Sequence, residues 1–85
     1  MSYFYAEISY SSKQDDSKIE KLIYPLLQKH NGNRYLGIGK LSTNGVLQSK
    51  IKYQFSKKDQ RDDFIKAINN SVGDDIFAQT LPLLQ

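Results

Sequence analysis

The dipeptide Asn44-Gly45 constrains the fold of this chain more than any other local feature. Both residues tolerate positive φ angles, so the pair is typical of a two-residue type I′ turn between antiparallel strands. Counting outward from this turn fixes a register in which side chains of one kind share a face. The apolar pairs predicted on one face are Ile38 with Ile51 and Leu36 with Tyr53. The pairs predicted on the other face are Gly39 with Lys50, Gly37 with Lys52 and Tyr35 with Gln54.

The segment before this hairpin predicts a strand and then a helix. Residues 3–10 are aromatic or strand-favouring and contain no breaker, which indicates a strand. Ser17 followed by Glu20 forms a capping box, and His30-Asn31-Gly32 is a helix stop. Pro25 lies inside this helix, where we expect a kink because the apolar spacing continues through it. The apolar stripe consists of Ile19, Leu22, Ile23, Leu26 and Leu27.

The segment after the hairpin repeats the same two elements in reverse order. Ser56 with Asp59 predicts the start of a second helix, and Gly73 predicts its end. Residues 75–81 predict a last short strand, which Pro82 terminates. The apolar stripe of the second helix consists of Phe64, Ile65, Ile68 and Val72.

The element order strand, helix, strand, strand, helix, strand predicts an α+β fold. We expect a ferredoxin-like βαββαβ two-layer sandwich, a four-stranded antiparallel sheet with both helices on one face. Right-handed crossovers place the first and third strands in the centre. With 85 residues, the chain is too short to split its core, so we expect one domain over residues 1–85.

Helices on one face leave the opposite side of the sheet, here called the open face, without cover. Alternation turns one set of side chains toward the helices. That set is Phe4, Ala6, Ile8, Tyr10, Leu36, Ile38, Ile51, Tyr53 and Phe55. Glu7 falls on the open face together with the residues that we predict to bind a partner. These predicted binding residues are Tyr3, Tyr5, Tyr35, Gly37, Gly39, Lys50, Lys52 and Gln54.

The amino-acid composition excludes several kinds of chemical site. The chain has no cysteine, which excludes disulfides and thiolate metal sites, and we expect no cofactor and no metal. The N-terminus lacks the pattern of a signal peptide, and no apolar run approaches the roughly 20 residues of a membrane span. We therefore expect a cytoplasmic protein. His30 is typical of a helix cap. The acidic pairs Asp62-Asp63 and Asp74-Asp75 are typical of charges exposed to solvent. We therefore expect no enzyme activity.

Known families with this order of strands and helices match the chain poorly at their functional motifs. The third-strand motif of RNA-recognition motifs needs a glycine, whereas residues 50–55 read Lys-Ile-Lys-Tyr-Gln-Phe. Acylphosphatases need an arginine and glycines in the loop that here spans residues 11–16 and contains neither. The small Cas2-type nucleases are similar in outline, but they carry an aspartate where this chain has Ser9-Tyr10-Ser11. The resemblance is one of element order and transfers no residue.

Three functional hypotheses remain. The first is a non-catalytic interaction protein (an inhibitor, antitoxin or adaptor, of the kind that phages and mobile elements encode) that binds a protein partner or its own copy through the open face or an edge strand. The second is a single-stranded RNA or DNA binder on the same face, since tyrosines stack on bases and lysines contact phosphates. The net charge of +3 is compatible with both. A Cas2-like metal-dependent nuclease is the remote third.

Overall fold

The computed structural model describes residues 3–43, 45–71 and 75–81. The elements follow the predicted order, with ends that differ by a few residues from the predicted ones. They are β1 (Phe4–Ser11), α1 (Asp16–Lys29), β2 (Asn33–Thr43), β3 (Val46–Phe55), α2 (Lys58–Ser71) and β4 (Ile76–Thr80).

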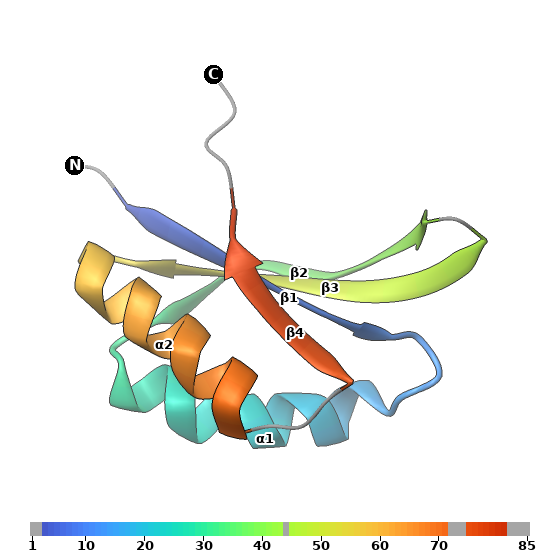
Figure 1. The fold of residues 1–85 in the computed structure, drawn as a ribbon, viewed down its shortest axis with the longest axis horizontal. Helices are drawn as coiled ribbons and strands as arrows, with labels where there is room; N and C mark the ends of the chain where they lie inside the picture. The colour runs from blue at the N-terminus through green and yellow to red at the C-terminus, as the bar shows by residue number, and fades with distance from the viewer. Residues whose placement is uncertain (1–2, 44, 72–74, 82–85) are drawn as a thin grey trace.

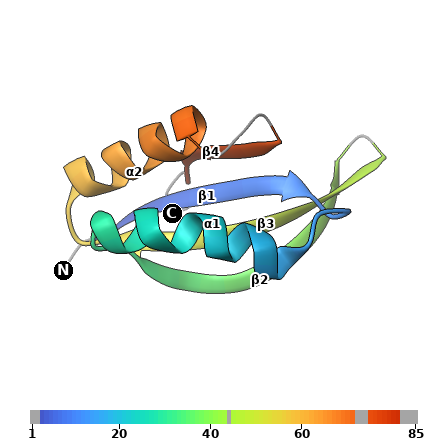
Figure 2. The same ribbon diagram turned by 90° about the horizontal axis from the view of Figure 1, so that it is seen from below.

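The described strands form one antiparallel four-stranded sheet in the order β2-β3-β1-β4. Both helices lie on the same side of this sheet, so the molecule has two layers (Figures 1 and 2). β1 and β3 are central, as predicted, and β2 and β4 are the edges. The tip of the β2–β3 hairpin extends past the ends of both helices (Figure 1). Within the described residues, neither helix has the length and apolar character needed to cross a membrane.

The core lies between the sheet and the helices. Ala6 and Ile8 are completely buried beneath the helices, and Phe4 is half-buried, which confirms the predicted facing of β1. The buried apolar residues are Ala6, Ile8, Tyr10, Ile19, Ile23, Leu27, Ile51, Tyr53, Phe55, Phe64, Ile68, Ile76 and Ala78. Leu22 belongs to the predicted stripe of α1 but is 47% exposed, so that part of the prediction is wrong. The side chain of Ile38 lies outside the described ones.

The predicted hairpin register is correct only near the turn. Gly39 lies opposite Lys50, as predicted. Next to the turn, Thr43 lies opposite Val46, and Gly45 has a φ of 79°. Asn44 lies outside the described residues. Nearer the start of β2, the register shifts twice, between Gly39 and Leu36 and again between Leu36 and Arg34.

These irregularities overturn three predicted pairs. Leu36 lies opposite Lys52, where Gly37 was expected. The residues opposite Tyr53 and Gln54 are Arg34 and Asn33, in place of Leu36 and Tyr35. Extra residues in one strand of a pair move the residues beyond them to the other face. Leu36 is therefore 47% exposed, and its predicted place in the core is wrong.

The N-cap of α1 lies two residues before the predicted one, Ser17. It is Asp15, whose side chain accepts a hydrogen bond from the Ser17 backbone N–H (3.0 Å), in place of a box made by Ser17 and Glu20. The helix continues through Pro25, as expected, while the kink there stays a prediction.

The predicted stop of α1 is confirmed. Asn31 adopts a φ of 57°, its N–H donates to Gln28 O, and the N–H of Gly32 donates to Leu27 O, which is the Schellman arrangement. α2 begins at Lys58, close to the predicted Ser56. Val72, Gly73 and Pro82 lie outside the described residues.

Candidate functional site

The open face carries most of the predicted binding residues. Tyr5 and Lys52 point away from the helices, because their neighbours along each strand, Ala6 and Tyr53, are buried beneath them. Lys50 and Gln54 alternate in the same way with the buried Ile51 and Phe55 of β3. The predicted facing of these residues is confirmed, while their role in binding stays a prediction.

A pair of tyrosines joins β1 to β2 on this face. The rings of Tyr5 and Tyr35 are 4.8 Å apart between centroids, with an angle of 51° between their planes. This tilted geometry is a favourable aromatic contact. Tyr35 remains 48% exposed, and Tyr3, just before β1, is 39% exposed. The face thus presents aromatic surface to whatever binds there.

A carboxylate lies beneath the lysines of this face. Glu7 is only 7% exposed although no helix covers it. Its Oε1 accepts a hydrogen bond from Gln79 Nε2 (3.1 Å) and forms an ion pair with Lys50 Nζ (3.4 Å). Lys52 enters no ion pair within the described part of the chain. The charge of Glu7 is therefore compensated by Lys50, while Lys52, opposite Glu7 in the β1–β3 register, adds a second positive charge beside the same carboxylate.

Sequence reasoning missed two apolar side chains that the open face exposes. Phe77 of β4 is 57% exposed and lies opposite Ser9 of β1. Leu36 of β2 is 47% exposed beside Lys52. The alternation of Ile76 and Ala78 with Phe77 was a signal that could have assigned Phe77 to this face. For Leu36 no such signal exists, because the bulges change its side.

A depression lies between β2 and β3 on the open face. Its volume is about 240 Å³ and its surface is mostly apolar. A Cβ atom added at Gly37 or Gly39 would meet no heavy atom within 4 Å, so both glycines border open space. The lining residues are Glu7, Leu36, Gly37, Gly39, Lys40, Lys50 and Lys52. Four of the predicted binding residues therefore meet at one place.

The two edges of the sheet are less open than its face. On β4, the Asn69 side chain of α2 accepts a hydrogen bond from the Ala78 backbone N–H (2.9 Å) and donates one to its carbonyl (3.0 Å). These contacts occupy both backbone groups that the middle of β4 does not use in pairing with β1. On β2, the two register shifts interrupt the other edge. Bulges and covered backbone groups are common protections against unwanted strand pairing.

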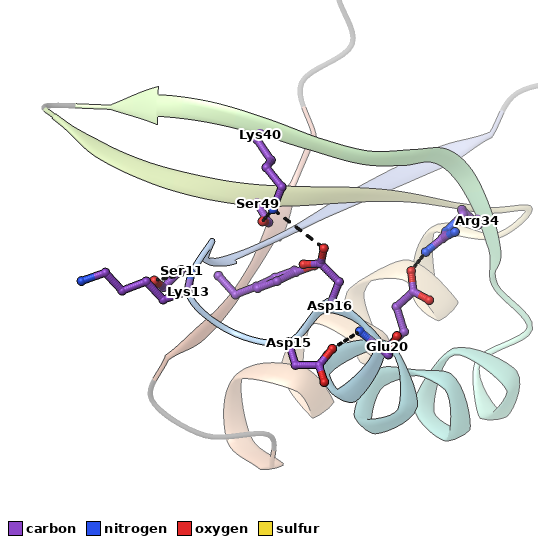
Figure 3. Close-up of polar contacts among 10 residues, drawn as sticks. Ser11, Lys13, Asp15, Asp16, Glu20, Arg34, Lys40 and Ser49 are labelled. Carbon is purple, nitrogen blue, oxygen red and sulfur yellow. Dashed lines mark hydrogen bonds and ion pairs between the residues drawn. The ribbon is translucent and has the colours of Figure 1, made fainter.

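Polar contacts on the helix side tie α1 to β2 (Figure 3). The Tyr10 hydroxyl donates to Asp16 Oδ1 (2.8 Å), and Lys40 Nζ lies 3.8 Å from Asp16 Oδ2 and donates to Ser49 Oγ (3.1 Å). Burial and the hydrogen bond to Asp16 raise the pKa of the Tyr10 hydroxyl. Arg34 and Glu20 form a second ion pair between the two elements. Each charge in this cluster faces an opposite charge, as in a structural network.

Other titratable residues show structural contacts. His30 is the C-cap of α1, and its ring lies 6.4 Å from that of Phe64 in an edge arrangement. Asp62 pairs with Arg61 at 2.8 Å, and Asp74 lies outside the described residues. Among the residues that are described, no three His, Cys, Asp or Glu side chains come together as a metal site.

Comparison with known proteins yields a likeness of fold. No protein-family model matches the chain, and no curated protein sequence does. Among solved structures, the chain is similar to the de novo designed protein Foldit4, with a TM-score of 0.58 and 12% sequence identity. The match covers 98% of this chain and 100% of that one. Identity this low shows the fold alone: a small α+β arrangement of two helices and an antiparallel sheet.

Proposed function

We propose that the chain is a non-catalytic domain of ferredoxin-like type that binds a protein partner through its open face, as an inhibitor, antitoxin or adaptor does. The observation that carries the proposal is the exposure of large apolar side chains on a face without helices. Tyr35, Leu36 and Phe77 are each about half exposed there (48%, 47% and 57%). Aromatic residues of this kind are enriched at protein–protein interfaces.

The state of the edges favours the face over strand addition. A partner strand that added to β4 would compete with the Asn69 side chain for the backbone of Ala78. One that added to β2 would meet an interrupted register between residues 34 and 39. Strand addition depends on a continuous row of free backbone groups. The open face needs no such row.

Photo-crosslinking tests the proposal. We would place a photoreactive phenylalanine analogue at Phe77 on the open face, and in a second protein at Tyr24 on α1. Both residues are 57% exposed, so they form a matched pair. The proposal predicts a discrete crosslinked protein from Phe77 in cells, absent from Tyr24. Equal products from both positions, or none from Phe77, would contradict it.

A second candidate function is single-stranded nucleic acid binding, which the Tyr5–Tyr35 pair beside Lys52 favours. Bases stack on aromatic rings for about 1–3 kcal/mol each. This candidate predicts that fluorescence anisotropy of labelled oligothymidylate rises with protein at low salt and that Tyr5→Ala weakens the effect. Affinity should fall as salt increases, through counterion release. Unchanged anisotropy at low salt would exclude it.

A further inference from the structure

We infer that the depression at Gly37 and Gly39 is an anchor site for one apolar side chain of an acidic segment in the partner protein. The inference rests on the proposed function and specifies the chemistry of the partner. It combines the shape of the depression with the charge at its rim.

The shape suits a single side chain. Pockets for drug-sized ligands hold roughly 300–1,000 Å³, whereas this depression holds about 240 Å³. It exists because β2 has no side chains at Gly37 and Gly39, while the exposed Leu36 stands beside them. An aromatic or branched aliphatic side chain placed there would exchange water for mostly apolar surface.

The charge at the rim selects an acidic neighbour. Glu7 pairs with Lys50 at 3.4 Å, and Lys52, which lies opposite Glu7 in the β1–β3 register, forms no ion pair among the described residues. The lining thus holds Lys40, Lys50 and Lys52 against the single carboxylate of Glu7. A carboxylate next to the inserted side chain would offset this excess of positive charge. A second copy of this chain fits poorly, because a symmetric face-to-face dimer places the same surface patch of both copies against each other. The lining of the depression holds three lysines and one glutamate, so the two patches would repel each other.

A larger cavity of about 380 Å³ lies between α1 and β2 on the other side of the sheet. It is lined by Glu20 and Arg34, which already pair with each other, together with Tyr24 and Tyr53. Its charges are satisfied within the chain, so it offers no comparable selectivity. It serves as an internal reference in the experiment below.

Three small probes of one shape test the inference: 3-phenylpropionate, its neutral amide and 3-phenylpropylammonium. Each is titrated into the protein while amide NMR spectra are recorded. We expect shifts at the amides of Gly37, Gly39 and Lys52, with the carboxylate binding most tightly and the ammonium least. An exposed ion pair corresponds to about a two- to five-fold difference in affinity.

Two variants locate the site. Gly39→Val fills the depression without touching the fold, since its Cβ meets nothing within 4 Å, and should abolish the shifts. Lys52→Gln should remove the preference for the carboxylate over the amide. The matched control is Lys21→Gln, which removes an exposed lysine of α1 and should leave all three titrations unchanged.

The inference is wrong if the Gly39→Val protein binds the carboxylate as tightly as the wild type does. It is also wrong if the amide shifts lie at Tyr24 and Gln28 in the other cavity, or if the three probes bind with equal affinity. It is also wrong if oligothymidylate shifts the same amides more strongly than the carboxylate, because the occupant is then a nucleic acid. Photo-crosslinks from Phe77 that persist despite a failed titration leave the proposed function intact. The two failures are therefore distinguishable.

Discussion

At the scale of single residues, Gly32 shows how closely α1 packs on the sheet. A Cβ atom at Gly32 would lie 2.4 Å from Cε2 of Phe55 and 2.6 Å from Cδ1 of Leu27. Phe55 is only 1% exposed and has little room to yield. We expect Gly32→Ala to lower the free energy of unfolding by about 1–3 kcal/mol, the usual range for overpacking. Urea unfolding followed by circular dichroism measures this loss.

A substitution at the neighbouring Asn31 is the control, because it should not lower the free energy of unfolding. Asn31 has a φ of 57°, a conformation that glycine adopts without a steric penalty. Asn31→Gly should therefore leave stability unchanged or raise it by up to about 1 kcal/mol. A Gly32→Ala protein as stable as the wild type would show that Phe55 and Leu27 move aside easily.

Because Tyr53 is buried, we expect the free energy of unfolding to fall in alkaline solution. Burial raises the pKa of Tyr53 from 10.0 to about 12, although Arg34 lowers it in part. Above about pH 10, Tyr53 loses its proton in the unfolded chain but keeps it in the folded protein, which favours unfolding. The contribution of Tyr53 to the free energy of unfolding is therefore fully present below about pH 10. It falls by about 1.4 kcal/mol per pH unit between the two pKa values.

The variant Tyr53→Phe isolates this effect. We expect urea unfolding to show a shallower decline for the variant than for the wild type between about pH 10 and pH 12. The difference between the two proteins should be constant from neutral pH to about pH 9, which provides the internal control. Parallel curves across the alkaline range would mean that Tyr53 ionises as readily in the folded protein as in the unfolded one.

Side-chain facing was predictable where a strand is regular and not where it is bulged. Tyr5 and Lys52 alternate with buried neighbours, so a period of two places them correctly. Leu36 resembles a core residue, but the register shifts of β2 expose it. The bond from Gln79 to Glu7 depends on how β4 pairs with β1, a long-range pairing that no local pattern contains.

At the scale of elements, the side chain of Asn69 in α2 covers the edge of β4. Its side chain makes two hydrogen bonds to the backbone of Ala78. We expect Asn69→Ala to destabilise the protein by about 1–2 kcal/mol, since it leaves a donor and an acceptor without their partner. The Ala78 amide should also exchange with deuterium faster, which NMR detects directly.

Asn70→Ala is the matched control. Asn70 is the next residue of α2, is exposed and makes no side-chain hydrogen bond among the described contacts. Its removal should leave exchange at Ala78 unchanged. If Asn69→Ala leaves that exchange equally unchanged, β4 does not depend on α2 for its edge.

Element types were predictable, while the ends of elements were less so. The stop at residues 30–32 combines asparagine and glycine, residues that suit a Schellman cap, and the structure uses them in that way. The start of α1 offered two competing caps, Asp15 and Ser17, and Asp15 is the one used. Both are good N-caps by type, so residue preference alone does not choose between them.

At the scale of the whole molecule, the two faces of the sheet differ in how their charges are used. On the helix side, Arg34 pairs with Glu20 and Lys40 approaches Asp16, so charges hold the layers together. On the open face, Lys50 and Lys52 lie beside the single carboxylate of Glu7, which pairs with Lys50, so positive charge is in excess among the described residues there. This asymmetry favours the open face as the surface that meets another molecule.

The same asymmetry predicts that the isolated protein is a monomer. Asn69 occupies the β4 edge, bulges interrupt the β2 edge, and a symmetric dimer through the open face would bring two lysine-rich patches of like charge together. We expect one sedimenting species at low salt over about a fifty-fold range of concentration, because self-association would shift with concentration by mass action. Asn69→Ala should show more association than Asn70→Ala, since it frees the β4 edge. A stable wild-type dimer at low salt would contradict this prediction, because repulsion between exposed lysines is strongest where counterions screen it least.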